Sequence, residues 1–377
     1  MAKNKPYFCR RKNKADLPMF NWLSTTKHAF VNKRTVKSVL LALPLTVLSA
    51  CGGNTEKAPD VSDVKVELNT RRLDQDITAI DTNNIAAGLQ NLQTKYPDFL
   101  PFFLDTLMGL GIQGNYNDSV QGISLGMHSF LTHKDYRGLL DTVAKHYPDT
   151  KEIDGWLQQG FQYHKHYFPN ANERKVVYMI SWLNNWAAFT YDSTILGIGL
   201  DMFLGASYPY YKAVGIPEYK STQLVKEYIP VVAFRAMYQE RTPFVMEDRT
   251  LLNMMIQRGI EAYYIEKVLP FVPKQVRLAY TEKQLKWCEE NEAGIYNFFI
   301  TQNFLYEKSL QKVVRYVMEG PSAAGMSDQS PGEVGTWMGL QIVKNYMAQH
   351  PEVTLDKLIA MQIDEQKILQ ESKYKPK

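Results

Sequence analysis

The first fifty residues limit how much of this 377-residue chain can contribute to a folded core. They hold ten Lys or Arg residues and one acidic residue, and a last basic cluster, Lys33 to Lys37, directly precedes an apolar run from Ser38 to Ala50. That run of about 13 residues is shorter than the roughly 20 that a membrane-spanning helix needs. A basic segment, a short apolar segment and small residues at its end are typical of a secretory signal. We therefore predict that residues 1–50 are removed before folding.

The apolar run ends in Leu48-Ser49-Ala50-Cys51, which resembles the lipobox cut by the lipoprotein signal peptidase. The resemblance implies that Cys51 becomes the first mature residue, with diacylglycerol on its sulfur and a further acyl chain, such as palmitate, on its amine. Several acyl chains on one residue anchor a protein stably, whereas a single chain binds marginally. The alternative is an N-terminal anchor that is never cleaved.

The chain then divides into three regions. Residues 1–50 are the N-terminal extension and signal peptide, residues 51–63 the lipidated cysteine and a flexible tether, and residues 64–377 a single globular domain. The tether is predicted because its sequence is polar and contains proline.

Loss of the signal changes the sign of the net charge. The whole chain has 43 basic and 39 acidic residues, and removing ten basic residues and one acidic residue leaves 33 against 38. This balance, without a Lys/Arg-rich stripe, argues against a nucleic-acid partner. Of the three cysteines, Cys9 leaves with the signal and Cys51 is lipidated. Cys288 then remains alone, so the mature protein has no internal disulfide and must rely on a hydrophobic core.

Hydrophobic patterns place strands in the middle of the chain and helices on both sides. Lys175–Ile180 and Thr194–Leu200 are short, apolar and β-branched, and Val64–Leu68 alternates apolar and polar residues as a half-buried strand does. Residues 85–168 show amphipathic helical segments, with breaks at Tyr96-Pro97, Gly114-Asn115 and Tyr147-Pro148. The predicted fold class is α+β, predominantly helical with a small central β-sheet.

Five further helices are predicted in the C-terminal half, over Leu224–Tyr238, over Leu251–Tyr264, from Thr281 to about Tyr306, behind Ser330 to about His350, and after Thr354. Thr281 and Gln284 form a capping box, and Ser330 is the expected cap of the helix that ends near His350, with Glu333 reaching back to the cap amide. That helix is apolar on more than one side, so it should be buried. Its Gly335 and Gly339 should allow close approach of another element.

Four motifs follow one another along the mature chain: Asp201-Met202-Phe203-Leu204-Gly205 with Tyr208-Pro209, Trp287-Cys288-Glu289-Glu290-Asn291-Glu292, Ser330-Pro331-Gly332-Glu333-Val334-Gly335-Thr336-Trp337-Met338-Gly339 with Gln341-Ile342-Val343, and Ser372-Lys373-Tyr374-Lys375-Pro376. Together they resemble the gliding-motility lipoprotein GldB family, from about Val64 to the end of the chain. The resemblance implies an envelope lipoprotein needed by the motility apparatus, but it implies no biochemical activity.

A more distant resemblance, in the order of strands and helices, is to zincin-like metallopeptidases, which carry His-Glu-x-x-His on a helix. Aligned to that motif, Glu227 takes the position of the general base, while Lys226 and Pro230 take the positions of the zinc-binding histidines. Arg258 takes the position of the acidic ligand on the next helix. We therefore predict a degenerate site without metal or cofactor and without zinc catalysis. The alternative is that Glu227 is an ordinary helical carboxylate beside Lys226.

Other candidate residues have simpler explanations. His164 and His166 are two apart, which does not place them on one helix face, and we expect both on a polar, aromatic-rich surface. Glu289, Glu290 and Glu292 are expected on a solvated helix face. Cys288 should be a buried, inert thiol, and capping explains Ser330 without a catalytic role.

The favoured hypothesis is a non-catalytic interaction protein that supports gliding motility or the associated surface machinery through an envelope protein partner. Its expected binding groove lies near Glu227, Arg258 and Leu204, lined by the tyrosines of Tyr208–Tyr219, because aromatic anchors suit interfaces. Gly52-Gly53 lacks an acidic retention signal, so we expect a lipid anchor in the outer membrane, facing the periplasm.

The alternative is a hydrolase, metal-dependent or not, acting on envelope peptides or cell-wall material. It requires the fold to bring His164 or His166 next to Glu227, within the short reach that catalytic groups need.

Overall fold

The computed structural model describes residues 57–110, 116, 121–184 and 187–377. The predicted lipidation site Cys51, the first part of the predicted tether and the predicted helix break at Gly114-Asn115 therefore lie outside the described residues.

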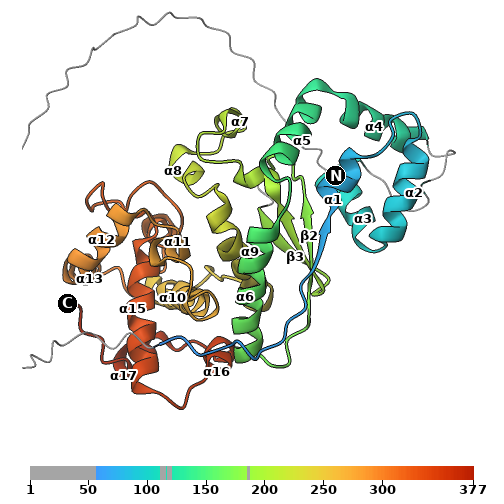
Figure 1. The fold of residues 1–377 in the computed structure, drawn as a ribbon. Helices are drawn as coiled ribbons and strands as arrows, with labels where there is room; N and C mark the ends of the chain where they lie inside the picture. Colours follow the sequence, from blue (N-terminus) through green and yellow to red (C-terminus); the bar gives the residue numbers. More distant parts are fainter. Residues whose placement is uncertain (1–56, 111–115, 117–120, 185–186) are drawn as a thin grey trace, which may run out of the picture. The chain divides into compact units, whose positions relative to one another are not determined.

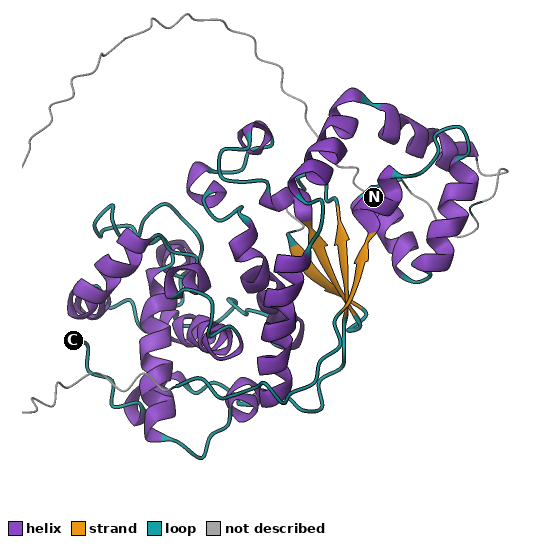
Figure 2. Ribbon diagram, in the orientation of Figure 1, coloured by secondary structure: helices purple, strands orange, loops and turns teal. Residues whose placement is uncertain are grey.

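A four-stranded mixed sheet lies among the helices (Figure 2). Its order is β1 (Asn69–Arg72), β2 (Lys175–Met179), β4 (Ile195–Gly199) and β3 (Ala188–Tyr191). The first three strands are parallel, and β3 is an antiparallel edge strand. The two predicted central strands are confirmed, and both are buried, as expected for apolar strands with both faces covered.

The predicted strand over Val64–Leu68 is wrong, because β1 begins only at Asn69. The earlier residues run along α6 (Lys151–Tyr167), where the side-chain amides of Gln162 and Gln158 donate to the carbonyls of Val64 and Val66. These backbone acceptors are therefore satisfied by a helix rather than by a neighbouring strand.

A group of helices and helical turns follows the first strand: α1 (Leu73–Thr78), α2 (Ile85–Lys95), α3 (Phe99–Phe102) with a π-helical turn (Phe103–Leu107), α4 (Gln121–Thr132) and α5 (Lys134–His146). The predicted breaks at Tyr96 and Tyr147 are confirmed, since each tyrosine follows the last residue of a helix. On one face of the edge strand, Phe99 and Phe102 stack on Phe189 and Tyr191.

The chain after the sheet is helical: α7 (Pro209–Ala213), α8 (Glu218–Ser221), α9 (Ile229–Arg241), α10 (Leu251–Val268), α11 (Lys274–Leu278), α12 (Glu282–Glu290), α13 (Glu292–Thr301), α14 (Leu310–Val313), α15 (Val334–Gln349), α16 (Leu355–Ala360) and α17 (Glu365–Glu371). Helix α9 packs on β3 and β4, and α6 packs on α9 and α10 (Figure 1).

Helices α10 and α15 form the closest helix pair and lie side by side in Figure 1. Gly339 makes this approach possible, because a Cβ atom there would stand 1.8 Å from the carbonyl oxygen of Met255. A Cβ on Gly259 would stand 2.3 Å from the carbonyl carbon of Gly339. Ten of the sixteen residues of α15 are buried, so both the predicted burial and the predicted close approach at its glycines are confirmed.

Two helix boundaries after α11 differ from the prediction. The capping box of Thr281 and Gln284 is present, but the helix behind it ends at Glu290 and a new one begins at Glu292. Ser330 does not cap α15, because its hydroxyl accepts from the amide of Ala323 and donates to the carbonyl of Ser327.

The observed class is α+β and predominantly helical with one small sheet, as predicted. Within the described ranges, no helix combines the length and the apolar character needed to cross a membrane.

Candidate functional site

The structure changes the setting of the predicted degenerate site. Lys226 and Glu227 lie in a 3-10 turn (Lys226–Tyr228), and the α-helix begins only at Ile229 with Pro230 in its first turn. Proline suits that position because the first amides of a helix have no intrahelical partner. The predicted helix over Leu224–Tyr238 is therefore wrong in its first part, and residues 226 and 230 do not share the face of a regular helix.

The members of the predicted site have separate partners. The Nζ atom of Lys226 lies 2.5 Å from a carboxylate oxygen of Glu152 on α6, and this hydrogen bond raises the lysine pKa. Glu227 is exposed. Arg258, on α10, pairs instead with Glu261 of its own helix at 2.9 Å. Lys226 and Arg258 therefore belong to two separate ion pairs, and neither pair joins one of these residues to the other.

His164 is buried, contrary to the predicted surface position, whereas His166 is exposed as expected. The Nδ1 atom of His164 is 3.0 Å from the hydroxyl of Tyr264, and burial lowers the histidine pKa to about 3, so the ring is neutral. Lys226 pairs with Glu152 near the start of α6, and His164 lies 12 residues farther along that helix. At 1.5 Å per residue this is about 18 Å, and His166 lies two residues farther still. The fold therefore brings neither histidine next to Glu227, and it does not support the hydrolase that requires this pairing.

A different set of side chains meets between α9 and α10, and we call it the arginine cluster: Arg235, Gln239, Arg258 and Glu261. The Glu261 carboxylate is the centre of this cluster. One of its oxygens accepts from the Gln239 amide at 3.1 Å and lies 4.0 Å from Nε of Arg235, and the other accepts from Arg258 at 2.9 Å.

Helical spacing explains how these residues meet. Arg235 and Gln239 are four apart on α9 and therefore share a face, and Arg258 and Glu261 are three apart on α10. The Arg258 guanidinium also stacks on the ring of Phe244, with 3.9 Å between its central carbon and the ring centroid.

This geometry has a chemical consequence. Two side chains four apart on one helix and a glutamate on the next could hold zinc if the pair were histidines. Here the pair is an arginine and a glutamine, and two guanidinium groups neutralise the carboxylate. Fixed positive charges beside Glu261 repel a metal cation. The described residues contain no group of three or more His, Cys, Asp or Glu side chains that could hold a metal ion.

A pocket opens beside the N-terminus of α15, and we call it the Glu333 pocket. Its volume is about 100 Å³, and its walls are Tyr219, Thr222, Gln223, Ala279, Tyr280, Thr281, Gln284, Glu319, Gly320, Pro331, Gly332 and Glu333. Gly332 allows two backbone segments of the wall to approach closely, because a Cβ atom there would stand 2.4 Å from the backbone nitrogen of Gly320.

Glu333 is the unusual group of this pocket. Its side chain sits at the N-cap position of α15 but does not cap the helix amides. Among the hydrogen bonds of the described residues, its carboxylate receives one, from the hydroxyl of Thr336 at 3.2 Å. Burial raises the pKa of Glu333 to about 7, while the charges of Arg235 and Arg258 act in the opposite direction. A buried carboxylate with so little compensation is costly to keep ionised.

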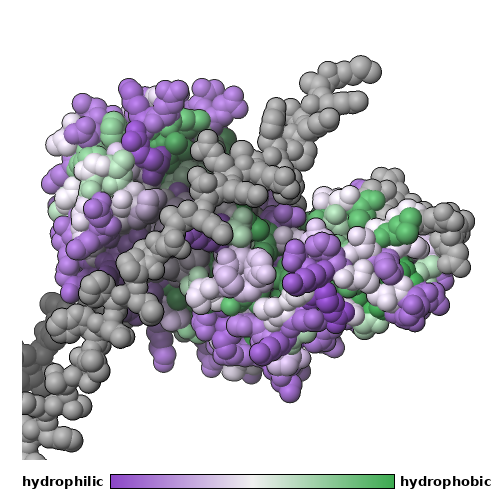
Figure 3. All heavy atoms as spheres, turned by 90° about the horizontal axis from the view of Figure 1, so that it is seen from above, coloured by the Kyte–Doolittle hydropathy of each residue, from purple (hydrophilic) through white to green (hydrophobic). Residues whose placement is uncertain are grey.

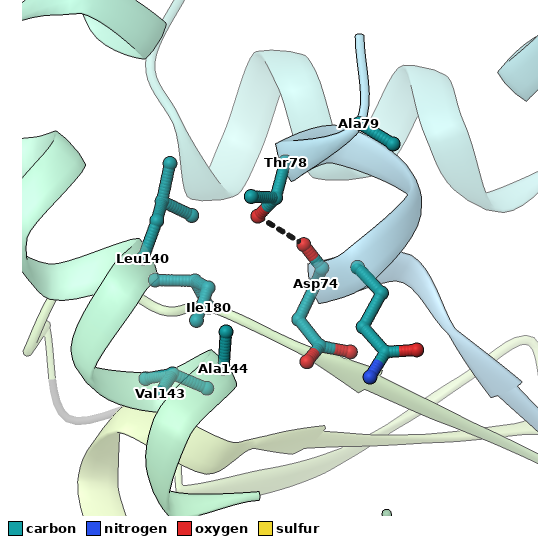
Figure 4. Close-up of a pocket in the computed structure, with 8 residues that line it drawn as sticks. Asp74, Thr78, Ala79, Leu140, Val143, Ala144 and Ile180 are labelled. Carbon is teal, nitrogen blue, oxygen red and sulfur yellow. Dashed lines mark hydrogen bonds between the residues drawn. The ribbon is translucent and has the colours of Figure 1, made fainter. Parts of the chain in front are cut away.

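A second cavity, of about 170 Å³, lies where β1 and β2 end. It is shown in Figure 4, with Asp74 and Thr78 of α1 on one side, Leu140, Val143 and Ala144 of α5 on another, and Ile180 after β2. Burial raises the pKa of Asp74, but its carboxylate is already held by Arg72 at 2.6 Å. This cavity is mostly apolar and offers no unpaired charge to a ligand.

The sequence matches the family described as "Gliding motility protein GldB" over residues 54–376. The chain belongs to this family. Searches among curated proteins and among solved structures gave no match. Membership confirms the resemblance and makes the chain a gliding-motility lipoprotein of the cell envelope, whereas the zincin-like architecture stays a prediction.

The Asp201 motif of this GldB-family chain is structural. The Asp201 carboxylate, after β4, accepts from the amides of Ser181 and Leu183, both at 2.7 Å, and burial raises its pKa to about 6. Trp182 and Leu183 have φ angles near 60°, so these bonds hold a left-handed turn after β2.

The acidic run and the C-terminal motif are linked by one contact. Glu289 pairs with Lys274 on the surface, as the predicted solvated face requires, but Glu292 is buried. The Glu292 carboxylate accepts from the hydroxyl of Tyr374 at 2.7 Å. The final residues thereby fasten the chain end to α13, while the buried Cys288 nearby has a pKa raised by burial, in agreement with an inert thiol.

The predicted tyrosine-lined groove is divided. Tyr211 is buried and its hydroxyl bridges the carbonyl of Asp201 and the amide of Leu204, so it belongs to the core. Tyr210 is 53% exposed, and Tyr219 lines the Glu333 pocket.

Sequence reasoning selected Arg258 but missed Arg235, Gln239, Glu261 and Glu333. Two local signals could have found the first three: an Arg-x-x-x-Gln spacing in α9 and an Arg-x-x-Glu spacing in α10. Glu333 was interpreted as part of a capping box, and its burial depends on contacts far away in the sequence.

Proposed function

We propose that this protein is a non-catalytic, lipid-anchored component of the gliding-motility machinery, which acts by binding another envelope protein. The observation that carries the proposal is the arginine cluster. The Glu261 carboxylate at its centre pairs with Arg258 at 2.9 Å and lies 4.0 Å from Arg235, so positive charge surrounds the acidic group that could otherwise bind a metal ion. A site built this way stabilises the packing of α9 on α10 and provides no activated water or nucleophile.

Surface composition supports binding to a protein. Figure 3 shows apolar patches between hydrophilic areas on one face. The large apolar side chains that remain exposed are Leu125, Tyr136, Tyr210, Val214, Val245, Ile300, Tyr306, Leu310 and Met318. Four of them, from Ile300 to Met318, follow one another in the chain from the end of α13 to the segment before α15. Exposed aromatic and aliphatic side chains of this kind are typical of interface anchors.

Placement in the cell belongs to the same proposal. Cys51 carries the lipid, residues 52–63 form the tether, and the domain from residue 64 faces the periplasm from the outer membrane. The absence of an acidic residue directly after Cys51 supports this membrane over the inner one.

The proposal is tested in gliding cells in which the introduced gene is the sole source of this protein. Replacing Cys51 by serine should abolish lipidation and release the protein from the membrane fraction, with loss of motility. Replacing Glu227 by glutamine removes the carboxylate once expected to be a general base, and motility should stay unchanged. Crosslinking of the wild-type protein in intact envelopes should recover one specific partner.

Metal content decides between binding and catalysis. The purified protein, prepared without chelators, should contain no stoichiometric zinc. One zinc per chain, or loss of motility in the Glu227→Gln variant at normal protein level, would overturn the non-catalytic proposal.

A further inference from the structure

The Glu333 pocket contains a buried carboxylate that the protein itself pairs poorly. At its N-cap position the side chain leaves the amides of α15 uncapped, and the one hydrogen bond that it receives within the described chain comes from Thr336. The guanidinium groups of Arg235 and Arg258 lie near enough to favour the ionised form of Glu333, but within the described chain neither donates a hydrogen bond to it. Arg258 pairs with Glu261 at 2.9 Å, and Arg235 lies 4.0 Å from the same carboxylate. Because an ionised carboxylate in a poorly solvated place is stabilised strongly by a positive charge, this pocket is set up for an external cation.

We propose that the Glu333 pocket receives the ammonium group of a lysine side chain presented by the protein partner. The inference rests on the proposed function, since it names the chemistry by which the partner is recognised. It assigns a role to Glu333 that packing of α15 does not explain.

The size of the pocket limits the occupant. About 100 Å³ accommodates several water molecules or an alkylammonium head, but it does not accommodate a sugar or a nucleotide. A lysine suits such a site because its charge is compact and sits at the end of a long apolar stem.

The lining favours a cation over an anion. Besides Glu333, the carboxylate of Glu319 lies at this wall, paired with Lys220 at 2.6 Å. Tyr219 and Tyr280 also line the pocket, and aromatic rings attract ammonium groups. The Tyr280 hydroxyl donates to the carbonyl of Glu333 at 3.0 Å, which holds this part of the wall in place.

The first experiment measures binding of a defined probe, n-butylammonium, to the full lipidated protein in detergent micelles by calorimetry. It is run at about pH 8, where Glu333 is ionised because its pKa is about 7. Replacing Glu333 by glutamine keeps the shape and removes the charge, and it should weaken binding at least about tenfold, or about 1.4 kcal/mol. Glu289→Gln is the matched control, because it makes the same change on an exposed surface, and it should bind as the wild type does. The neutral analogue n-butanol should not bind.

The second experiment uses the partner. Affinity recovery from envelopes is compared for the wild type, Glu333→Gln and Glu289→Gln, with and without acetylation of lysines in the envelope fraction. Acetylation removes the lysine charge. Recovery should fall for Glu333→Gln and after acetylation, and should persist for Glu289→Gln.

The outcomes separate the two proposals. Equal butylammonium binding by the wild type and Glu333→Gln, or no binding by either, overturns the lysine pocket. Partner recovery that survives both the substitution and acetylation also overturns it, while the proposed function stands. Failure of the wild type to recover any partner removes the proposed function and the lysine pocket together. Circular dichroism melting of Glu333→Gln verifies that a loss of binding is not a loss of folding.

Discussion

Replacing Gly339 by alanine should push apart α10, which carries Arg258 and Glu261 of the arginine cluster, and α15, whose N-cap residue is Glu333. A Cβ atom at this position would stand 1.8 Å from the carbonyl oxygen of Met255 and 2.5 Å from its carbonyl carbon. Both atoms belong to the backbone of α10, so no side-chain rotation can relieve the clash. Helices α10 and α15 must therefore move apart by more than about 1 Å to restore van der Waals contact.

The magnitude follows from two opposing effects. Overpacking of a core costs typically 1–3 kcal/mol and occasionally more, and a backbone clash belongs at the upper end of that range. Alanine gains up to about 1 kcal/mol of helix propensity over glycine. The expected net loss is about 2 kcal/mol or more in the free energy of unfolding, which lowers the Tm by roughly 3 °C or more in a domain of this size.

A control inside the same chain isolates the clash from the propensity. Gly138 lies within α5 and is exposed, and a Cβ atom there would meet nothing within 4 Å. Gly138→Ala should therefore raise the free energy of unfolding by at most about 1 kcal/mol, and the Tm should rise with it. Both variants are compared with the wild type by circular dichroism melting. If Gly339→Ala melts at or above the wild-type temperature, the close contact between α10 and α15 is wrong.

Three further predictions concern buried carboxylates. Burial raises the folded-state pKa of Glu333 from 4.5 to about 7, so the unfolded chain loses this proton first as the pH rises. Up to about 3 kcal/mol of the free energy of unfolding is therefore lost between those pH values. Denaturant unfolding should show that Glu333→Gln stabilises the protein at about pH 8 and not below about pH 4.5. Replacing Glu261 by glutamine leaves the two guanidinium groups of the arginine cluster without their counter-charge and should cost about 2–4 kcal/mol in the same assay, whereas a cost near zero would mean that water replaces the carboxylate. Replacing Tyr374 by phenylalanine removes the donor to Glu292 and should cost about 1–2 kcal/mol, together with faster proteolysis of the C-terminal residues.

Local signals in the sequence were sufficient for several elements. The strand from Lys175 was predicted because its run of apolar, β-branched residues suits a strand buried on both faces. The capping box of Thr281 and Gln284 involves residues three apart, so it is written in the local sequence. The short edge strand β3 was not predicted, since its four residues are half-buried and lack a clear apolar pattern.

Elements that depend on distant contacts were not predictable in this way. Ser330 and Pro331 have the residue types of a helix start, yet the Ser330 hydroxyl is occupied by Ala323 and Ser327. The segment before α15 is shaped instead by the approach of Gly332 to Gly320. The arginine cluster joins α9 to α10 across 26 residues between Arg235 and Glu261, and no periodicity in one helix reports the register of another.

Three glutamates are buried in the helical C-terminal half, and a comparison among them argues for the lysine pocket. Glu261 is neutralised by guanidinium groups, and Glu292 accepts a hydrogen bond from Tyr374 at 2.7 Å. The Glu333 carboxylate accepts a longer bond, 3.2 Å from the hydroxyl of Thr336, and burial raises its pKa to about 7. It is also the one that lines a pocket. A buried carboxylate at the wall of a cavity, with one long hydrogen bond and no ion pair of its own among the described residues, gains most from a cation supplied by another molecule.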